Sequence, residues 1–145
     1  MRSSLTRLAM DAWASKTKAQ LSALARVATQ DLAERVIDGT PVDTGNLVGN
    51  WQPSLNAPNL AVNDMPTSNA YAQSVLAGVI PQFKAGDRFY YTNATAYARR
   101  IEFGFVGPDA LGRVYNQAGQ YPVTKAIAAW DQIVDAAAVK LGMTK

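Results

Sequence analysis

The chain has 145 residues, of which 48% are hydrophobic and 17% charged, and these values exclude a chain that is disordered throughout. Fourteen Lys and Arg against eleven Asp and Glu leave a net charge of +3, too mild for a dedicated nucleic-acid binder. The chain has no Cys and no His, which excludes disulfides, thiol nucleophiles, Ser-His-Asp triads and Cys or His metal sites.

No apolar run reaches the roughly 20 residues that a membrane helix needs. Charged residues interrupt the N-terminal apolar residues at Arg2, Arg7 and Asp11, so we expect no secretory signal peptide. The expectation is a soluble protein with no membrane partner.

The first predicted element is a long helix from Ser15 to Asp38. Its apolar residues recur at steps of three and four; they are Leu21, Leu24, Ala28, Leu32 and Val36. Gly39 followed by Pro41 is a stop signal. About 22 helical residues span about 33 Å, which is more than a small core can cover. Upstream, residues 1–14 are expected to form a further helical arm.

A stretch without Lys or Arg follows at residues 41–83, and its many Asn and Pro residues are typical of turns. We expect Asp43, Thr44 and Gly45 to form a structural turn, in which the Asp43 side chain accepts the backbone amide of Thr44 or Gly45. Between residues 46 and 69 the neutral chain is either a loop packed on its own domain or a surface buried by a partner subunit, and composition does not separate the two.

The other predicted elements combine short helices and strands with a second long helix. In chain order they are a strand at 47–55 around Trp51, a short helix at 69–80, an aromatic strand at 88–92, a short helix at 95–103, a glycine-rich loop at 104–120 and a long helix at 123–141. The predicted fold class is α+β. Its long N- and C-terminal helices pack on a small, mainly antiparallel sheet, with a short extra helix and long loops.

Four carboxylates are the most open to a catalytic interpretation: Asp43, Asp87, Glu102 and Asp109. Paired carboxylates can hydrolyse glycosides or hold Mg²⁺, but nothing in the spacing marks such a site, and there is no His to share the proton transfer. Because Glu102 follows Arg99 and Arg100 on a predicted helix, an ion pair within the helix or across a subunit boundary explains it. We therefore expect no enzyme activity, no cofactor and no metal site.

Signals for nucleotide or nucleic-acid binding are weak. The glycines of 104–112 match neither common phosphate-binding pattern. Arg99 and Arg100 with nearby tyrosines could stack on bases, but the aromatic residues at 89–91 are more typical of packing in a strand. The tryptophans Trp13, Trp51 and Trp130 are expected to anchor the core or an interface. This profile favours an assembly protein.

Two segments resemble a known family. Thr40–Leu47 reads Thr-Pro-Val-Asp-Thr-Gly-Asn-Leu and precedes Trp51, which resembles the T-P-V-D-T-G-x-L…W signature of tailed-bacteriophage neck and minor tail proteins, also called tail-completion proteins. The segment Tyr91–Gly104 resembles their N-x-x-x-Y-A-x-x-(I/L/V)-E-(F/Y)-G stretch. The resemblance covers about residues 15–141, and the Asn- and Pro-rich insert at 56–69 departs from it.

The resemblance implies one tail-completion domain over residues 1–145. It implies a structural virion protein, without enzyme activity, at the head–tail junction or the head-proximal tail end. Such a protein forms a ring around the DNA channel, with six subunits favoured over twelve. Its partners would be further copies of itself and the neighbouring connector, tail-terminator or tail-tube proteins, with DNA passing nearby. It would reside in the virion, and in the host cytoplasm during assembly.

A closed ring needs two different complementary surfaces on each subunit. One is expected in the segment after Tyr97 with the following loop, and the other on the long helix or in residues 46–69. The candidates in the first surface are Tyr97, Arg99, Arg100, Ile101, Glu102, Phe103 and Gly104. Arg99, Arg100 and Glu102 offer charges of both signs for pairing across the boundary.

Other functions stay open at this point. A ring protein could instead be the tail terminator or the head-closure connector. A small DNA-binding or packaging module would use Arg88, Arg99 and Arg100, and a metal-dependent carboxylate enzyme would use Asp43 or Glu102.

Overall fold

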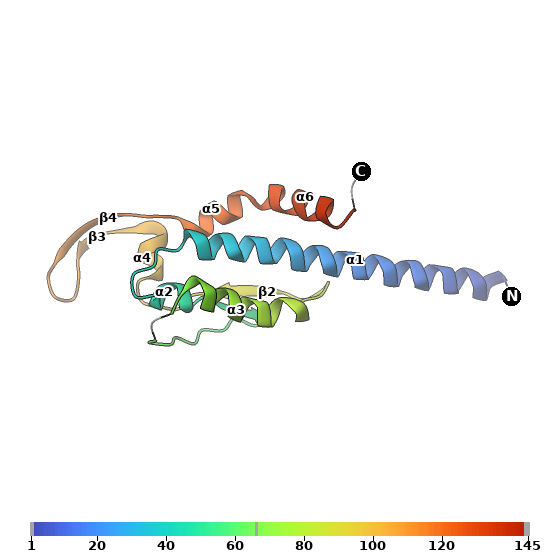
Figure 1. The fold of residues 1–145 in the computed structure, drawn as a ribbon, viewed down its shortest axis with the longest axis horizontal. Helices are drawn as coiled ribbons and strands as arrows, with labels where there is room; N and C mark the ends of the chain where they lie inside the picture. The colour runs from blue at the N-terminus through green and yellow to red at the C-terminus, as the bar shows by residue number, and fades with distance from the viewer. Residues whose placement is uncertain (1, 66, 144–145) are drawn as a thin grey trace.

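One helix sets the length of the molecule. In the computed structural model, which describes residues 2–65 and 67–143, α1 runs unbroken over Arg2–Gly39 (Figure 1). The helix predicted from residue 15 and the predicted arm upstream of it are therefore one continuous element. No Gly or Pro interrupts it before Gly39. Its end is closed by Thr40, whose Oγ1 donates to the carbonyl of Val36 at 2.6 Å.

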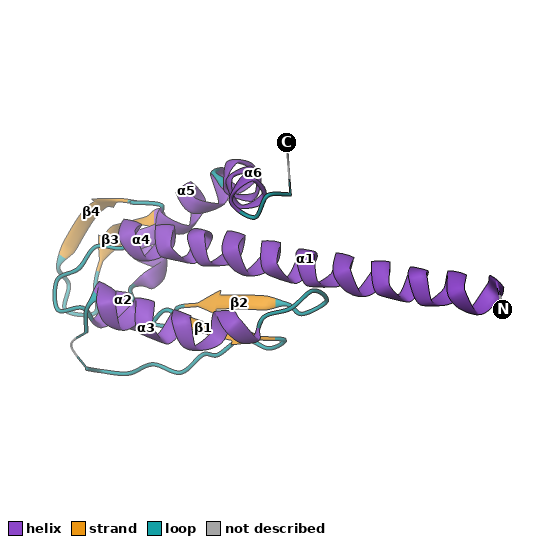
Figure 2. Cartoon of the chain, turned by 45° about the vertical axis from the view of Figure 1, so that its right-hand side comes forward, coloured by secondary structure: helices purple, strands orange, loops and turns teal. Residues whose placement is uncertain are grey.

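Two layers flank the second half of α1. On one side lie α5 (Pro122–Ala128) and α6 (Trp130–Lys140), and on the other lie α2 (Asn46–Gly49), α3 (Asn69–Val79) and a small sheet (Figures 1 and 2). The short 3-10 helix Ile80–Gln82 extends α3. In the sheet, β1 (Gln52–Leu55) pairs with β2 (Phe89–Thr92), with Gln52 opposite Thr92 and Leu55 opposite Phe89.

A second pair of strands projects from the end of the body, away from the N-terminus of α1 (Figure 1). The short helix α4 (Ala98–Phe103) leads into β3 (Gly104–Pro108), which turns back as β4 (Val114–Ala118). Both strand pairs are antiparallel, so the predicted class, α+β with a small antiparallel sheet, is confirmed.

Three predicted elements differ from the structure. The strand predicted at 47–55 begins only at Gln52, because Leu47 and Val48 are buried in the short helix α2. The loop predicted at 104–120 contains the β3–β4 pair. The long helix predicted at 123–141 is broken at Ala129, which separates α5 from α6 and lets α6 pack back along α1 (Figure 2).

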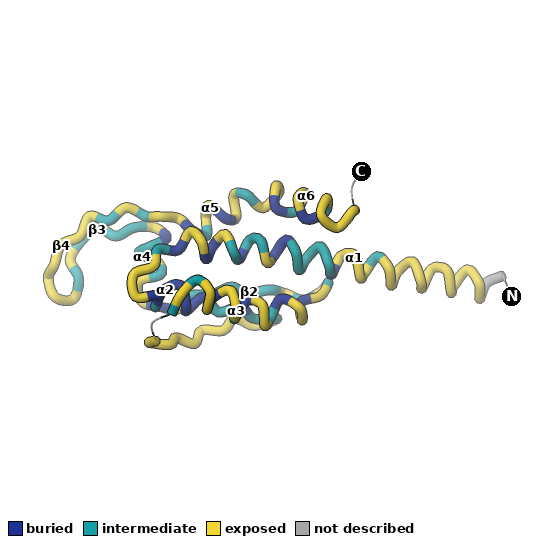
Figure 3. The backbone as a smooth tube through the Cα atoms, viewed as in Figure 1, coloured by how far each residue is buried: buried dark blue, intermediate teal, exposed yellow. Residues whose placement is uncertain are grey.

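The hydrophobic core consists of two clusters that share α1. The larger joins the α1 residues Val36 and Ile37 to Leu76 of α3 and to Trp51 just before β1. The smaller joins Ala28 of α1 to α6. Residues 4–16 and 18–21 of α1 are exposed (Figure 3), so the first half of the helix lies outside both clusters.

Trp51 connects the two ends of this core. Its Nε1 donates to Thr40 Oγ1 at 3.0 Å, and its ring stacks on Tyr91 of β2 with a centroid distance of 5.3 Å. The expectation of a tryptophan anchor thus holds for Trp51, whereas Trp13 is 69% exposed on the arm.

We predict that Ile37→Ala destabilises the chain by about 2–5 kcal/mol, because it opens a cavity at a fully buried position of the larger cluster. Urea unfolding followed by circular dichroism measures the effect. Leu5→Ala on the exposed arm is the control and should change the free energy of unfolding by less than about 0.5 kcal/mol. Equal effects of the two substitutions would contradict this description of the core.

Candidate functional site

The segment of the first motif makes a bend that enters α2. Residues 43–45 form the bend, and Gly45 has φ of +83°, a conformation that favours glycine. Thr67 Oγ1 donates to the Gly45 carbonyl, and a side chain on Gly45 would collide with the backbone of Thr67. Glycine is therefore required here both for its dihedral angle and for space.

The side chain that closes the bend is not the one predicted. The backbone N–H of Asn46 donates to Thr44 Oγ1 at 3.3 Å. Asp43 is exposed, and in the described part of the chain its carboxylate accepts no hydrogen bond. The expected contact from Asp43 to the amide of Thr44 or Gly45 is thus replaced by one from Thr44, since the bend turns the Asp43 side chain toward solvent.

The two motif segments meet in space. A cleft of about 450 Å³ is lined by residues 41–47 on one side and by Tyr97, Ile101 and Gln120 on the other. These segments lie some fifty residues apart in the sequence. Their contact joins α2 to α4 and makes the two motifs parts of one structural unit.

The neutral loop is held against its own domain by Asn50. The buried Asn50 amide donates to the carbonyl of Asn63 at 2.8 Å and accepts from its N–H at 2.7 Å. Thr92 of β2 adds a hydrogen bond to the carbonyl of Asn59 at 2.5 Å. The loop nevertheless exposes Leu60, Val62 and Met65.

Glu102 is a helix cap, not an exposed interface charge. Its carboxylate accepts from the backbone N–H groups of Val123 and Thr124 at 3.0 and 2.9 Å, and from Thr124 Oγ1 at 2.6 Å. These are free donors at the start of α5, so the predicted pairing of Glu102 across a subunit boundary is wrong. Its side chain is spent on joining α4 to α5 of the same chain.

The environment of Glu102 favours its charged form. Burial by itself would raise the pKa of Glu102, but the hydrogen bonds from Thr124 and Val123 and the nearby charge of Lys125 lower it below the ordinary value of 4.5. The carboxylate therefore stays ionised and capped at neutral pH.

The other candidates in this segment divide between the fold and the surface. The Arg100 guanidinium lies 3.8 Å from the ring centroid of Phe105 in β3, a cation–π contact within the chain. Gly104 has φ of +83° where α4 passes into β3. Ile101 is half-buried and lines the cleft, and three candidates remain exposed: Tyr97, Arg99 and Phe103.

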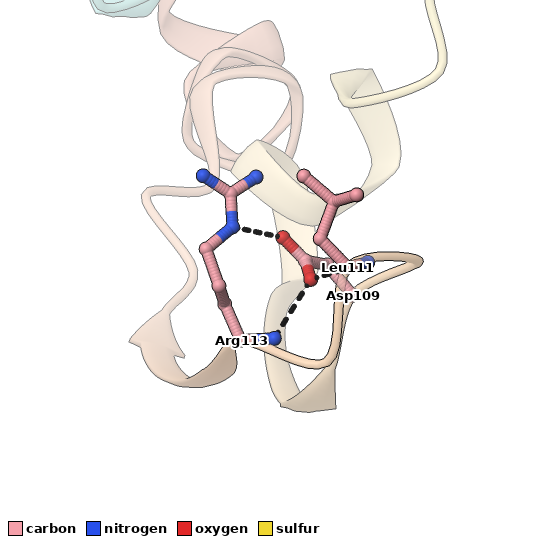
Figure 4. Close-up of polar contacts among 3 residues, drawn as sticks. All are labelled: Asp109, Leu111 and Arg113. Atoms are coloured by element: carbon pink, nitrogen blue, oxygen red, sulfur yellow. Dashed lines mark hydrogen bonds and ion pairs between the residues drawn. The ribbon is translucent and has the colours of Figure 1, made fainter.

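Asp109 closes the turn between β3 and β4 (Figure 4). One oxygen accepts from the N–H groups of Leu111 and Arg113, both at 2.9 Å, and the other accepts from Arg113 Nε at 2.7 Å. Desolvation works against ionisation, but these bonds outweigh it, so the pKa of Asp109 lies below its ordinary value. Its role in the structure is to define the turn.

The carboxylates considered for catalysis are not brought together. Glu102 caps α5 and Asp109 closes the hairpin, while Asp87 accepts from the Asn56 amide and from the N–H of Lys84. Within residues 2–65 and 67–143, no group of three or more Asp or Glu could hold a metal ion. The same residues contain no helix that is long and apolar enough to cross a membrane.

The β3–β4 hairpin presents an apolar surface that the sequence interpretation missed. Val106 and Val114 lie on one face, 77% and 80% exposed, and Leu111 at the tip is 78% exposed. The other face carries Phe105 and Tyr115. The signal in the sequence is the pair of β-prone segments flanking Asp109–Gly112, which the surrounding glycines obscure.

Comparison of the chain with protein-family models, curated proteins and solved structures gave no match.

We predict that Glu102→Gln destabilises the chain by about 1–3 kcal/mol at neutral pH, because a charge-assisted cap is lost. A carboxylate with a lowered pKa stabilises the folded chain above its ordinary pKa, and this stabilisation disappears as pH falls through the folded value. Unfolding measured from about pH 7 to pH 3 should therefore depend less on pH in the variant. Glu34→Gln on α1, where the carboxylate accepts from Gln30 at the surface, should keep the wild-type dependence.

We predict that Gly45→Ala destabilises the chain more than Gly112→Ala does. Both glycines have positive φ, which costs alanine about 1–2 kcal/mol, but only Gly45 has backbone in the way of a side chain. Asp43→Ala should change the free energy of unfolding by less than about 0.5 kcal/mol. Thermal melts of the three variants check this, and a large loss in Asp43→Ala would show that its carboxylate does bind the turn.

Proposed function

We propose that this chain is a structural protein of a tailed-bacteriophage particle, located at the head–tail junction or the head-proximal end of the tail. It forms a ring around the DNA channel and completes or joins the tail. The observation that carries the proposal is the contact between the two motif segments: residues 41–47 and Tyr97 with Ile101 line one cleft. Two short patterns matched by chance would have no reason to pack against each other.

The polar residues support a mechanical role. Glu102, Asp109 and Asn50 all bind groups of their own chain, where they fix a helix start, a turn and a loop. Side chains used in this way hold a shape and are not free to act on a substrate. A ring protein needs such a fixed shape because each subunit must present its surfaces at a constant angle.

The exposed apolar residues supply two different surfaces for a ring. One is the hairpin face with Val106 and Val114, continued by Phe103 at the end of α4. The other is the loop that exposes Leu60, Val62 and Met65. Contact of the hairpin of one subunit with the loop of the next is heterologous, the kind of contact that closes rings. We favour six subunits over twelve.

Two alternatives have less support. A DNA-binding module would gather Arg88, Arg99 and Arg100, but Arg100 lies over Phe105, and Arg88 precedes β2 while Arg99 belongs to α4. Strongly salt-dependent DNA binding by the purified chain would favour that module. A tail terminator or head-closure ring differs from our proposal only in position, which a map of the intact particle decides.

We predict that Val114→Asp leaves the chain folded but prevents particle completion, because it places a charge on the exposed hairpin face. Electron microscopy of lysates should then show separate heads and tails where the wild-type gene gives joined particles. Val139→Asp, at an equally apolar and 66% exposed position on α6, is the control and should give joined particles. Joined particles with Val114→Asp would contradict the hairpin surface, and normal virions lacking the protein would contradict the function itself.

A further inference from the structure

An apolar stripe on α1 continues beyond the helix that covers it. Met10, Trp13, Thr17 and Leu21 recur at steps of three and four residues, and Leu24 and Ala28 follow at the same steps. Ala28 and Leu24 pack against Ile133 and Ala137 of α6, which runs beside this half of α1. The stripe from residue 10 to residue 21 thus has the same composition as its covered continuation.

No described part of the chain covers this first half of the stripe. Met10 is 65% exposed, Trp13 69% and Leu21 49%, and α6 ends at Lys140. A shallow hollow on this surface is lined by Trp13, Ala14, Thr17 and Leu21, with Asp11 and Lys18 at its side. An indole exposed beside such a hollow is suited to fill a matching one on a second helix.

The charges beside the stripe identify the second helix. Asp11 follows Met10 and Lys18 follows Thr17, so both lie on the same edge of the stripe, two turns apart. When two copies of this helix run antiparallel, this edge of one faces the same edge of the other. Placing Met10 opposite Leu21 of the second copy then brings each Asp11 within about 3 Å, along the axis, of the other copy's Lys18.

We propose that the arms of two copies of this chain pair antiparallel through this stripe and form a symmetric dimer. Each arm takes the place, on the other, that α6 takes on the second half of α1. Trp13 lies opposite Thr17 and Lys18 of the second copy and fills its hollow. Two Asp11–Lys18 attractions set the register, and they outweigh one repulsion between the Lys16 side chains on the opposite edge, whose long stems reach solvent. The inference does not rest on the proposed function.

The test is the oligomeric state of the full chain, measured by sedimentation equilibrium over about 1–100 µM, the range expected for a small helical interface. We expect the wild type to dimerise. Met10→Asp should weaken the dimer at least about tenfold, whereas Leu8→Asp, 64% exposed on the opposite face of the arm, should leave it unchanged. Circular dichroism verifies that both variants are folded. A wild type that stays monomeric, or equal losses in the two variants, would overturn the proposal.

Orientation has its own test. Asp11→Lys alone should weaken the dimer, and Asp11→Lys combined with Lys18→Asp should restore it. The chain has no cysteine, so an introduced thiol reacts with its own copy alone. Thr17→Cys, near the symmetry axis, should form a disulfide-linked dimer, whereas Met10→Cys should do so only together with Leu21→Cys. A charge swap that fails to restore the dimer, or a disulfide from Met10→Cys alone, would refute the antiparallel arrangement.

Discussion

Both core clusters are built on the same half of one helix, and this constraint shapes the rest of the molecule. The stretch of α1 from Leu24 to Ile37 is enclosed between the layer of α5 and α6 and the layer of α3 and the small sheet. A chain of this size has apolar side chains for only one such stretch. The other half of α1 therefore extends from the body as an arm, and its apolar residues are available to a second molecule.

The end of α1 is where the layers are fastened together. Thr40 closes the helix through the Val36 carbonyl and accepts a hydrogen bond from Trp51, which in turn stacks on Tyr91. The bend at Gly45 follows immediately and leads into the cleft against α4. Since α4 continues into the hairpin, the position of the projecting strands depends on this junction. This arrangement gives the first motif a structural reason: it connects the spine of the fold to the surface that we propose for assembly.

The two proposed contacts use different parts of the chain and are compatible. Ring closure would involve the hairpin and the neutral loop, whereas arm pairing would involve the stripe that begins at Met10. The first contact joins unlike surfaces and the second joins like surfaces, so a ring could carry one arm contact per subunit without competition. A particle built in both ways would link each subunit to a copy outside its own ring.

The sequence by itself determined the elements whose signals are local. The spacing of Leu24, Ala28, Leu32 and Val36 predicted the helix, Gly39 and Pro41 predicted its end, and the aromatic residues of 89–91 predicted β2. Helical period, terminating residues and strand propensity all act within a few residues, so one chain without relatives is enough to interpret them.

Only the tertiary structure decided what the polar residues and the glycine-rich segment do. Glu102 was expected to bind a neighbouring subunit, but it binds α5, twenty residues further along the chain. The loop expected at 104–120 became a hairpin because its halves found each other through the turn at Asp109. The helix expected at 123–141 broke at Ala129 because α6 gains more by packing Ile133 and Ala137 on α1 than by continuing straight. In each case the deciding partner is distant in sequence, and a local pattern carries no information about a contact that only folding creates.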